Sequence, residues 1–509
     1  MSGFKVPKVD TSRFPFPIQS FIGGKFVDSP GNEKHTLKSS VNDAVLTTEL
    51  QWSNAKDVDI AVESSRDGLR LWQAMTDSQK RDALIKYSQL IRDNREQLHW
   101  LEAVLVGKDT GFCNFEIDAA ADLFVYYANM IDKFQTDVVS TKVDTLQYTL
   151  RQPWGICAGI CPFNGVIITL AMKAAPALAC GNSIIIKTSE LNPFSTLFMA
   201  SLAIQAGIPP GALNCLVGGA EVGVALSSHM EIRKISFTGS IKVGKLIQVA
   251  AAQSNLKSVT LELGGKSPMI VFPDADLERA LQTATMFLLM NGQGCALPTR
   301  LYVHDSIANE FIAKLKAIVE EHGRHLGGDP TLPDTRSSPL YHQRQKEVVL
   351  SYIEAGMKEA TLLTGGQPIG DKGCYIEPTI FVNPHPDAKI LREEIFGPVL
   401  TVVRFSTDDE VVQLANDTEF GLAAYVWTDD MSRALTLSQK LEAGTVSVNG
   451  AGGLQPSVPT GGWKRKIPQL SNLTLSTNQY SFLESGQGTE NGKEAMLDWT
   501  QLKSVAIKG

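Results

Sequence analysis

The sequence predicts an α/β protein built on two parallel β-sheets, and three observations support this fold class. From Val166 onward, short apolar segments alternate with longer helical segments, as in sheets covered by helices on both faces. The alternation pauses at Gly264-Gly265 and begins again at Met269, which indicates a second α/β unit. The 509 residues, 43% of them hydrophobic, provide two to four domains with substantial cores.

Composition excludes several classes of partner. The formal net charge of -7 provides no basic surface for nucleic acid or an anionic membrane. The longest apolar stretch, residues 165–180, is interrupted by Lys173 and Pro176 and is too short to cross a bilayer. Seven scattered cysteines fit a reducing compartment, so we expect a cytoplasmic protein. Cys157 and Cys161 have no second Cys or His pair nearby, so we expect no metal.

The N-terminal third is expected to be mostly helical. Short strands are expected within residues 20–50, and helices over 55–72, 78–106 and 115–134. Five apolar side chains of the second helix share one face, and they are Leu84, Ile85, Tyr87, Leu90 and Ile91. Residues 143–151 then alternate apolar and polar side chains, and with 156–160 they predict a β-hairpin.

Each α/β unit has its own set of expected elements. In the first unit, helices are expected over 166–179, 196–206, 220–227 and 241–252, and strands over 183–187, 214–217, 234–237 and 258–261. In the second unit, strands are expected over 269–271, 301–303, 399–405, 423–427 and 445–448, and helices over 277–289, 307–321, 408–416 and 431–441. Parallel sheets of this kind bind ligands at the carboxyl ends of their strands.

Two motifs at strand ends are suited to a nucleotide. Phe237-Thr238-Gly239-Ser240 ends a strand and opens a helix, so its N–H groups could hold a phosphate, although Ser240 could equally be an N-cap. It does not match the GxGxxG fingerprint. Lys187 and Glu190 follow another strand and could bind ribose hydroxyls, or they could form a solvated turn.

Three further residues are candidates for catalysis. Cys295 follows Gly292 and Gly294, and it is either a small buried residue or a nucleophile that a ligand can approach closely. Glu262 lies between leucines at a strand end, where burial would raise the pKa of its carboxyl as a general base requires, unless it is a paired structural residue. Asn164 opens a helix and could stabilise an oxyanion or serve as an N-cap.

Taken in order, these motifs resemble the aldehyde dehydrogenase superfamily, and specifically its fungal- or plant-like non-acylating members. The resemblance covers residues 20–464, resumes near Ser485, and includes the motifs at 163–164, 187–190, 237–240, 262–266, 292–295 and 393–399. It implies a Rossmann-like NAD(P)-binding domain (1–135 and 156–263) and a catalytic domain (264–464). It also implies an oligomerisation flap (136–155 and 485–509) whose exposed edges would pair in a homodimer or homotetramer.

The resemblance also implies a role for each site residue. Cys295 would attack the aldehyde to give a thiohemiacetal and then a thioester. Asn164 and the Cys295 N–H would hold the oxyanion, and Glu262 would activate the hydrolytic water. The cofactor-binding residues would be Phe163, Lys187, Glu190, Phe237, Gly239, Ser240, Leu263, Gly264, Glu394 and Phe396. The Glu190 carboxylate would repel a 2′-phosphate, which favours NAD while NADP stays possible.

Two other functions stay open at this stage. One is a CoA-acylating enzyme, in which a thiol replaces water, and the other is a catalytically impaired binding descendant. The family's substrate tunnel would be lined by Gly165, Thr169, Met172, Leu289 and Leu454. These apolar residues favour a medium-sized aliphatic or aromatic aldehyde.

Residues 465–484 form an atypical insertion. Relatives have one residue between the positions of Lys464 and Ser485, whereas this chain has 20. The insertion is either a surface loop, since long loops cost little entropy, or an unspliced intron. Arg465-Lys466 can be encoded with a GTAAG donor and Leu483-Glu484 with an acceptor AG. If residues 465–484 are a real surface loop, they lie near the flap, and the enzyme can be active only if the fold tolerates them there.

Overall fold

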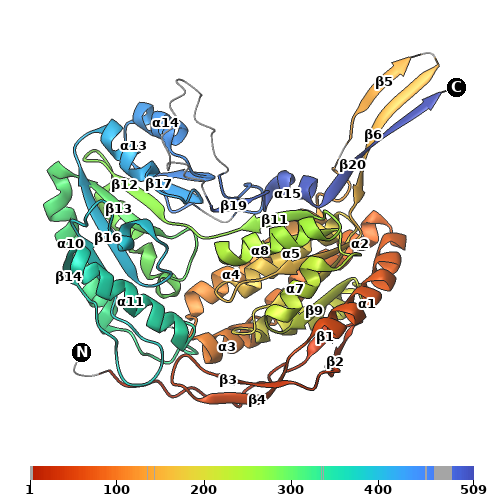
Figure 1. The fold of residues 1–509 in the computed structure, drawn as a ribbon, viewed down its shortest axis with the longest axis horizontal. Helices are drawn as coiled ribbons and strands as arrows, with labels where there is room; N and C mark the ends of the chain where they lie inside the picture. Colours follow the sequence, from red (N-terminus) through yellow and green to blue (C-terminus); the bar gives the residue numbers. More distant parts are fainter. Residues whose placement is uncertain are drawn as a thin grey trace.

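Two sheets divide the protein into two lobes, and a three-stranded ribbon projects from one of them (Figure 1). The computed structural model describes residues 4–134, 136–142, 144–333, 335, 338–452, 455–463 and 484–508. Most of the atypical insertion and Leu454 of the expected tunnel therefore lie outside the described residues. The two expected α/β units correspond to the two lobes.

The sheet of the first lobe has the strand order β19-β11-β10-β7-β8-β9-β1-β2. Its strands are β1 (Ser20–Ile22), β2 (Lys25–Val27), β7 (Ile156–Ile160), β8 (Ser183–Thr188), β9 (Leu213–Val217), β10 (Lys234–Thr238), β11 (Ser258–Glu262) and β19 (Gly486–Gln487). Strands β7 to β11 are parallel. The chain runs from β7 outward to β9 and then crosses back to β10, so the strand order reverses between β7 and β10. Open α/β sheets bind ligands at such a reversal.

Helices cover both faces of this sheet (Figure 1). They are α1 (Ala55–Ala74), α2 (Asp77–Asp93), α3 (Arg95–Val106), α4 (Thr110–Ala128), α5 (Val166–Ala179), α6 (Phe194–Ala206), α7 (Ala220–Ser228), α8 (Ile241–Gln253) and α15 (Gly492–Asp498). Every residue of α5 is buried, because this helix contacts both β8 and α4. The segment before α5 is therefore held in the interior, where the site is built.

The second lobe contains a seven-stranded sheet of order β14-β15-β16-β13-β12-β17-β18. Its strands are β12 (Ser267–Val271), β13 (Pro298–His304), β14 (Thr361–Thr364), β15 (Thr379–Val382), β16 (Val399–Phe405), β17 (Ala423–Trp427) and β18 (Thr445–Val448). Its helices are α9 (Leu277–Ala284), the 3-10 helix η1 (Thr285–Gly292), α10 (Asp305–Arg324), α11 (Gln343–Glu359), α12 (Lys389–Arg392), α13 (Asp408–Asn416) and α14 (Met431–Lys440).

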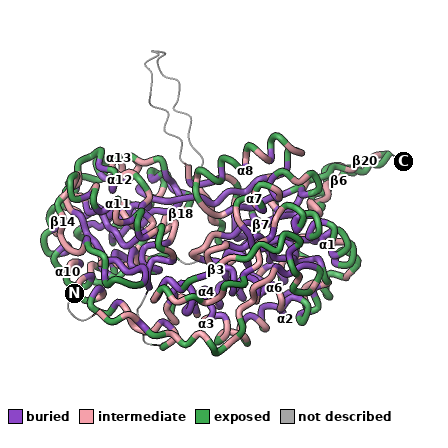
Figure 2. Tube along the Cα trace, turned by 60° about the horizontal axis from the view of Figure 1, so that its bottom comes forward, coloured by how far each residue is buried: buried purple, intermediate pink, exposed green. Residues whose placement is uncertain are grey.

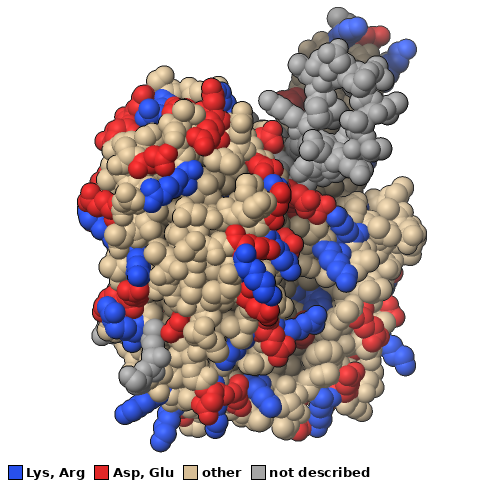
Figure 3. Space-filling model, turned by 60° about the vertical axis from the view of Figure 1, so that its left-hand side comes forward, with Lys and Arg blue, Asp and Glu red and all other residues tan. Residues whose placement is uncertain are grey.

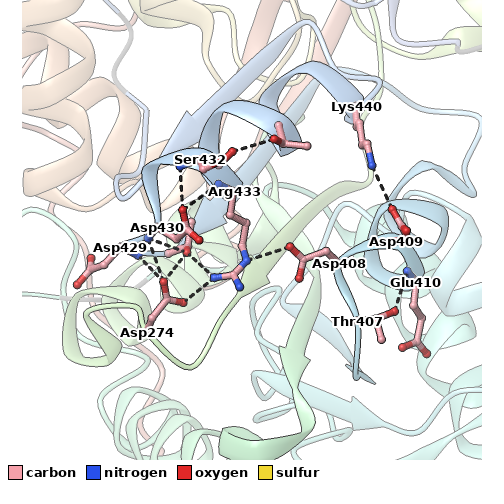
Figure 4. Close-up of polar contacts among 12 residues, drawn as sticks. Asp274, Thr407, Asp408, Asp409, Glu410, Asp429, Asp430, Ser432, Arg433 and Lys440 are labelled. Atoms are coloured by element: carbon pink, nitrogen blue, oxygen red, sulfur yellow. Dashed lines mark hydrogen bonds and ion pairs between the residues drawn. The ribbon is translucent and has the colours of Figure 1, made fainter.

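Asp274 ties this lobe together at its surface (Figure 4). Its carboxylate accepts hydrogen bonds from the Thr428 hydroxyl and from the N–H groups of Asp429 and Asp430 at 2.7–3.1 Å. Arg433 of α14 bridges Asp274 and Asp408 of α13. The loop after β12, the loop after β17 and two helices are thereby fixed to one another.

The projecting ribbon consists of β5 (Val138–Lys142), β6 (Thr145–Pro153) and β20 (Thr500–Lys508), in the order β20-β6-β5. The expected hairpin between 143–151 and 156–160 is wrong, because β6 pairs with β5 and β20 while β7 joins the eight-stranded sheet. A further pair, β3 (Lys34–Lys38) and β4 (Val45–Gln51), runs along the lower edge in Figure 1. Among the described residues of 485–508, β20 lies in the ribbon, whereas β19 belongs to the eight-stranded sheet.

Other expectations also need correction. The expected helix over 78–106 is two helices, α2 and α3, which meet at Asn94. Ile85 is exposed, whereas Leu84, Tyr87 and Ile91 are buried, so the buried face of α2 is narrower than expected. The helix expected over 277–289 ends at Ala284 and continues as η1.

Exposure separates the ribbon from the lobes. Buried residues fill both lobes, whereas the ribbon is mostly exposed and intermediate (Figure 2). On the face drawn in Figure 3, acidic and basic side chains are interspersed. Within the part of the chain that the structure describes, no helix is long and apolar enough to cross a membrane.

Candidate active site

The carboxyl ends of the parallel strands bring distant motifs to one edge of the first sheet. Asn164 follows β7, Lys187 and Glu190 follow or end β8, Ser240 follows β10, and Glu262 ends β11. Their strands are neighbours in the order β11-β10-β7-β8. Residues up to 98 positions apart in sequence, from 164 to 262, therefore share one edge. The second lobe supplies the turn that carries Cys295.

The turn before Cys295 has an unusual backbone. Met290, Asn291 and Gly292 have φ angles of 51°, 52° and 77°, which places three consecutive residues in the left-handed region. We expected Gly292 to let a ligand approach. Instead, a Cβ on Gly292 would collide with the Gly397 carbonyl, so this glycine lets the turn pack against the 393–399 segment.

Hydrogen bonds hold the same turn on both sides of Cys295. Gln293 is fully buried, and its Oε1 accepts the N–H of Tyr341 at 3.0 Å. The Tyr425 hydroxyl donates to the Ala296 carbonyl at 2.9 Å. A Cβ on Gly265 would meet the Cys295 carbonyl, so the loop after Glu262 touches the turn directly. Cys295 thus occupies a fixed position between the lobes.

Asn164 reaches this turn from the first lobe. Its Nδ2 donates a hydrogen bond to the Gln293 carbonyl at 2.7 Å. The amide group has two N–H bonds, so one remains to serve an oxygen atom near Cys295. Asn164 is not the N-cap of α5, because Gly165 occupies that position and has no side chain with which to cap.

Glu262 is a buried carboxyl whose proton affinity is high. Its side chain is 8% exposed, and Oε1 has no hydrogen-bond partner among the described residues. Burial, followed by the neighbouring Glu490, raises the pKa of Glu262 well above its usual value, while Lys173 acts in the opposite direction. A buried carboxyl group with one oxygen free of hydrogen bonds is suited to accept a proton.

Lys173 and Glu490 belong to the site, although the sequence did not identify their roles. Lys173 Nζ lies 2.6 Å from Glu490 Oε1 and also donates to the hydroxyls of Ser236 and Thr238. Both side chains are buried. The signal in the sequence was the charged Lys173 within an apolar helix, which we considered only as an interruption.

The pKa of the Cys295 thiol is raised to about 12. Burial is the largest cause, followed by the negative charges of Glu394 and Glu262. The thiol is therefore protonated at neutral pH in this state, and nucleophilic attack requires a group that removes its proton or a nearby positive charge.

Glu394 connects the 393–399 segment to the loop after β11. Its Oε1 accepts the N–H of Gly265 at 2.9 Å, and a Cβ on Gly264 would collide with its carboxyl group. Burial raises the pKa of Glu394 to about 7. Phe396 has a φ of 56° and packs edge-to-face with Phe163, with ring centroids 5.8 Å apart. A polar group and an aromatic ring therefore lie beside the Cys295 turn.

The other expected cofactor residues occupy the same strand edge. Lys187 Nζ lies 3.2 Å from Glu190 Oε2. Ser240 is exposed and caps α8, accepting the Val243 N–H at 3.5 Å. The remaining residues are less accessible: Phe237 and Leu263 are buried, and Gly239 has the Phe237 ring beside it.

This edge suits a dinucleotide. It combines the N-terminus of α8, a lysine–glutamate pair at a strand end and a carboxyl next to an aromatic ring. Among the described residues, no cluster of three or more His, Cys, Asp or Glu side chains could hold a metal ion. The arrangement combines a thiol, a buried base, an amide donor and a nucleotide cradle.

Comparison with known proteins gives a consistent family. Residues 26–469 match the aldehyde dehydrogenase family. The chain is 40% identical over 491 residues to aldehyde dehydrogenase 1 of Tanacetum cinerariifolium, covering 95% of this chain and 94% of that protein.

Solved structures agree with this match. One is the Pseudomonas syringae indole-3-acetaldehyde dehydrogenase AldA, a cysteine-to-alanine variant in complex with NAD⁺ and IAA, with a TM-score of 0.91, 35% identity and 98% coverage of both chains. Another is an Escherichia coli NADP-dependent enzyme, with a TM-score of 0.90, 31% identity, 97% coverage of this chain and 98% of that chain.

Proposed function

Because the chain belongs to the aldehyde dehydrogenase family, we propose that Cys295, Glu262 and Asn164 carry out its reaction, the NAD(P)-dependent oxidation of an aldehyde to a carboxylic acid. The observation that carries this assignment is their convergence. Asn164 Nδ2 contacts the Cys295 turn, and the loop after Glu262 abuts the Cys295 carbonyl.

The first step forms a bond between sulfur and carbon. The Cys295 sulfur attacks the aldehyde carbon, and the thiol proton passes to the Glu262 carboxylate. The carbonyl oxygen becomes an oxyanion, which the free N–H of Asn164 Nδ2 and the backbone N–H of Cys295 stabilise. Loss of one such donor typically lowers the rate about 10²–10³-fold.

The second half of the reaction releases the acid. The bound dinucleotide supplies the acceptor for the hydride that leaves the substrate carbon. Cys295 then holds the acyl group as a thioester. Glu262 releases the thiol proton to solvent, and as a carboxylate it then removes a proton from the water that attacks the thioester. The C–S bond breaks, and the acid leaves. The hydrogen-bonded pair of Lys173 and Glu490 acts on Glu262 through charge, because Glu490 raises the pKa of the Glu262 carboxyl and Lys173 lowers it.

The dinucleotide cradle favours NAD. We assign Lys187 and Glu190 to the adenosine ribose, and Ser240 with Gly239 to the diphosphate. The partly exposed Glu190 carboxylate would repel a 2′-phosphate. The remaining assignments place Glu394 on the nicotinamide ribose and, around the rings, Phe163, Phe237, Leu263, Gly264 and Phe396.

A cysteine variant tests the assignment. Cys295→Ala should abolish NADH formation from a panel of aldehydes, measured by NADH absorbance, because the proposed nucleophile is gone. Its NAD dissociation constant, measured by calorimetry, should change less than about threefold, since the cradle is intact. Turnover retained by this variant would remove Cys295 from the mechanism, and wild-type rates higher with NADP than with NAD would overturn the cofactor preference.

A CoA-acylating reaction is the second candidate. It would need a thiol, rather than water, to resolve the thioester. Glu262 argues against it, because activation of water, which we assign to Glu262, is the step that such an enzyme does not need. Formation of acyl-CoA in preference to acid when both acceptors are present would reverse this choice. The presence of Cys295, Asn164 and Glu262 likewise argues against a non-catalytic binding protein.

The substrate passage favours a medium-sized aliphatic or aromatic aldehyde. Thr169 and Met172 of α5 are buried at 7% and 9% exposure, and the Thr169 hydroxyl is occupied by the Gly165 carbonyl at 2.7 Å. Leu289 is 39% exposed. The described part of the wall of the substrate passage is therefore apolar. Comparison of kcat/KM for aliphatic aldehydes of different lengths and for aromatic aldehydes would test this preference.

We also propose a homodimer or homotetramer in the cytoplasm. The ribbon exposes apolar side chains at Val138, Val139, Leu146, Leu502 and Ile507, which a partner subunit would cover. The free cysteines fit a reducing compartment. Cell fractionation tests the cytoplasmic location, and sedimentation velocity of ribbon variants tests the assembly.

A further inference from the structure

We infer that three buried charged side chains, Glu102, Lys108 and Glu116, position Asn164 for catalysis. This inference rests on the proposed role of Asn164 as an oxyanion donor. None of the three touches the reacting atoms, so they are positioning residues. Their effect passes through the segment between β7 and α5.

The three residues form a buried ion triad. Lys108 Nζ lies 2.6 Å from Glu102 Oε2 and 2.6 Å from Glu116 Oε2, and all three side chains are 0% exposed. Glu102 belongs to α3 and Glu116 to α4, with Lys108 in the connection between them. Burying such charges is costly unless hydrogen bonds satisfy the remaining carboxylate oxygens. Those hydrogen bonds lead to the Asn164 turn.

Glu116 holds the segment on the C-terminal side of Asn164. Its Oε1 accepts the backbone N–H groups of Ile167 and Ile168, each at 3.1 Å. These groups lie in the first turn of α5, where N–H groups lack partners within the helix. The N-cap residue Gly165 has no side chain, so a carboxylate from α4 performs the capping.

Glu102 holds the segment on the N-terminal side. Its Oε2 accepts a hydrogen bond from Asn192 Nδ2 at 2.9 Å. The same Asn192 amide donates to the Phe163 carbonyl at 3.1 Å. The peptide before Asn164 is thus connected to one carboxylate, and the helix after Asn164 to the other. Lys108 fixes the distance between the two carboxylates.

This arrangement matters because oxyanion stabilisation depends on position. Donors act at about 2.7–3.1 Å from the developing charge, and a displacement of about 1 Å can cost 10²-fold in rate. Asn164 has one N–H on the Gln293 carbonyl, so its second N–H is aimed only if its backbone is fixed. The triad fixes that backbone from both sides.

Glu116→Gln is the first test. It replaces the carboxylate that pairs with Lys108 and caps α5. We expect kcat to fall about 10–100-fold, part of the loss caused by removing an oxyanion donor, while the NAD dissociation constant changes less than about threefold. In an Asn164→Ala background, the same substitution should cause no further loss in kcat, because its effect passes through Asn164.

Asp57→Asn is the matched control. Asp57 is also a buried carboxylate, in the first turn of α1, where it accepts hydrogen bonds from the Ser29 hydroxyl and from the N–H of the N-cap residue Asn54. This control should lower thermal stability and leave kcat within about twofold. A kcat for Glu116→Gln within twofold of wild type would overturn the inference, as would a full additional loss in the Asn164→Ala background.

Asn192→Ala keeps the inference testable if Glu116→Gln does not fold. It leaves all three charges in place and removes the hydrogen bond to Phe163. We expect a kcat reduction of about 5–50-fold. Ser195→Ala is its control, because among the described residues the Ser195 hydroxyl donates a hydrogen bond to Glu102 and none to the Asn164 turn. It should change kcat less than about threefold.

The proposed oxyanion role of Asn164 and the inferred positioning role of the triad can be disproved by different results. If Asn164→Ala alone leaves kcat unchanged, the proposed oxyanion role is wrong. If Asn164→Ala lowers kcat but Asn192→Ala does so no more than Ser195→Ala, the positioning inference is wrong and the oxyanion role stands.

Discussion

At the scale of single residues, the reactivity of Cys295 is set by the carboxyl groups around it. Glu394 and Glu262 raise the pKa of its thiol, in addition to burial. A like charge near a thiolate disfavours ionisation, so removing one should lower the thiol pKa. The Glu262 carboxylate, which we propose as the base that activates water, therefore disfavours the Cys295 thiolate that attacks the aldehyde.

Glu262→Gln should separate these two effects. The pH at which iodoacetamide alkylates Cys295 at half its maximal rate should fall, because a negative neighbour is gone. In rapid mixing with aldehyde and NAD, the variant should release about one equivalent of NADH per site, more slowly than wild type because Glu262 no longer takes the thiol proton. It should then nearly stop, since the thioester is not hydrolysed. Steady turnover at the wild-type rate would exclude Glu262 as the hydrolytic base.

Glu394 gives a prediction on stability against pH. Its folded-state pKa is about 7, raised from 4.5 by burial, so the folded state retains a proton that the unfolded chain releases. Below pH 4.5 both states are protonated, and Glu394→Gln should match wild type. As pH rises to 7, the wild type should lose stability relative to the variant, by at most about 3 kcal/mol. Urea titrations at pH 4.5, 6 and 7.5 measure this difference, and a constant difference would contradict it.

Residue identities could be predicted from the sequence only where they stand in short motifs. Cys295, Glu262 and Asn164 were predicted from such motifs, and the structure brings the three to one region. Glu490 was not, because its partner Lys173 is 317 positions away and the two meet only after folding. The reason for Gly292 was also missed, since the Gly397 carbonyl lies far along the chain.

At the scale of elements, the turn before Cys295 combines strain with close packing. Gly292→Ala would place a Cβ at φ 77° against the Gly397 carbonyl. Left-handed backbone and the collision should cost about 1–3 kcal/mol and displace the turn, so kcat should fall as well. Thermal unfolding and steady-state kinetics measure the two effects.

Gly223→Ala is the control for this substitution. A Cβ on Gly223 in α7 meets nothing within 4 Å, and alanine should stabilise that helix by about 0.5–1 kcal/mol without changing kcat. Equal behaviour of the two variants would show that the Gly292 position is not constrained.

The spacing of apolar residues predicted helices and strands well wherever the buried positions recur with the period of the helix or strand. The expected bounds of α5, α13, β16, β17 and β18 agree with the structure. Elements were missed in 343–392, where α11, β14, β15 and α12 lie. The last three have only four residues each, and α11 is buried at only four positions, so their periodicity is weak. The wrong hairpin arose because pairing of β6 with β20 joins residues 145–153 to 500–508. Local alternation cannot reveal such a partner.

At the scale of the whole molecule, the chain on either side of residues 464–483 is held at one place. The Trp463 N–H donates to the Gly421 carbonyl at 3.0 Å, and the Gly421 N–H donates to the Ser485 hydroxyl at 2.9 Å. Ser485 also binds the loop after Glu262 through the Gly264 carbonyl and the Leu263 N–H. Hydrogen bonds therefore anchor the chain next to the proposed active site on both sides of the insertion. This supports a site that tolerates the added residues, and transcript sequencing across codons 460–490 decides whether they are retained.

The ribbon is the surface through which subunits should associate. β5 and β20 form its two edges, with unpaired backbone groups among the described strands, and Leu502 and Ile507 of β20 are 57% and 50% exposed. Leu502→Glu with Ile507→Glu should place like charges in the interface and lower the assembly mass, measured by sedimentation velocity, from oligomer toward monomer.

Leu435→Glu on α14, where Leu435 is 58% exposed outside the ribbon, is the matched control and should keep the wild-type mass. Because the proposed cofactor-binding residues all lie in one chain, dissociated subunits should retain NAD binding. An unchanged mass for the double variant would place the interface elsewhere, and a monomeric wild type would end the proposal of a homo-oligomer.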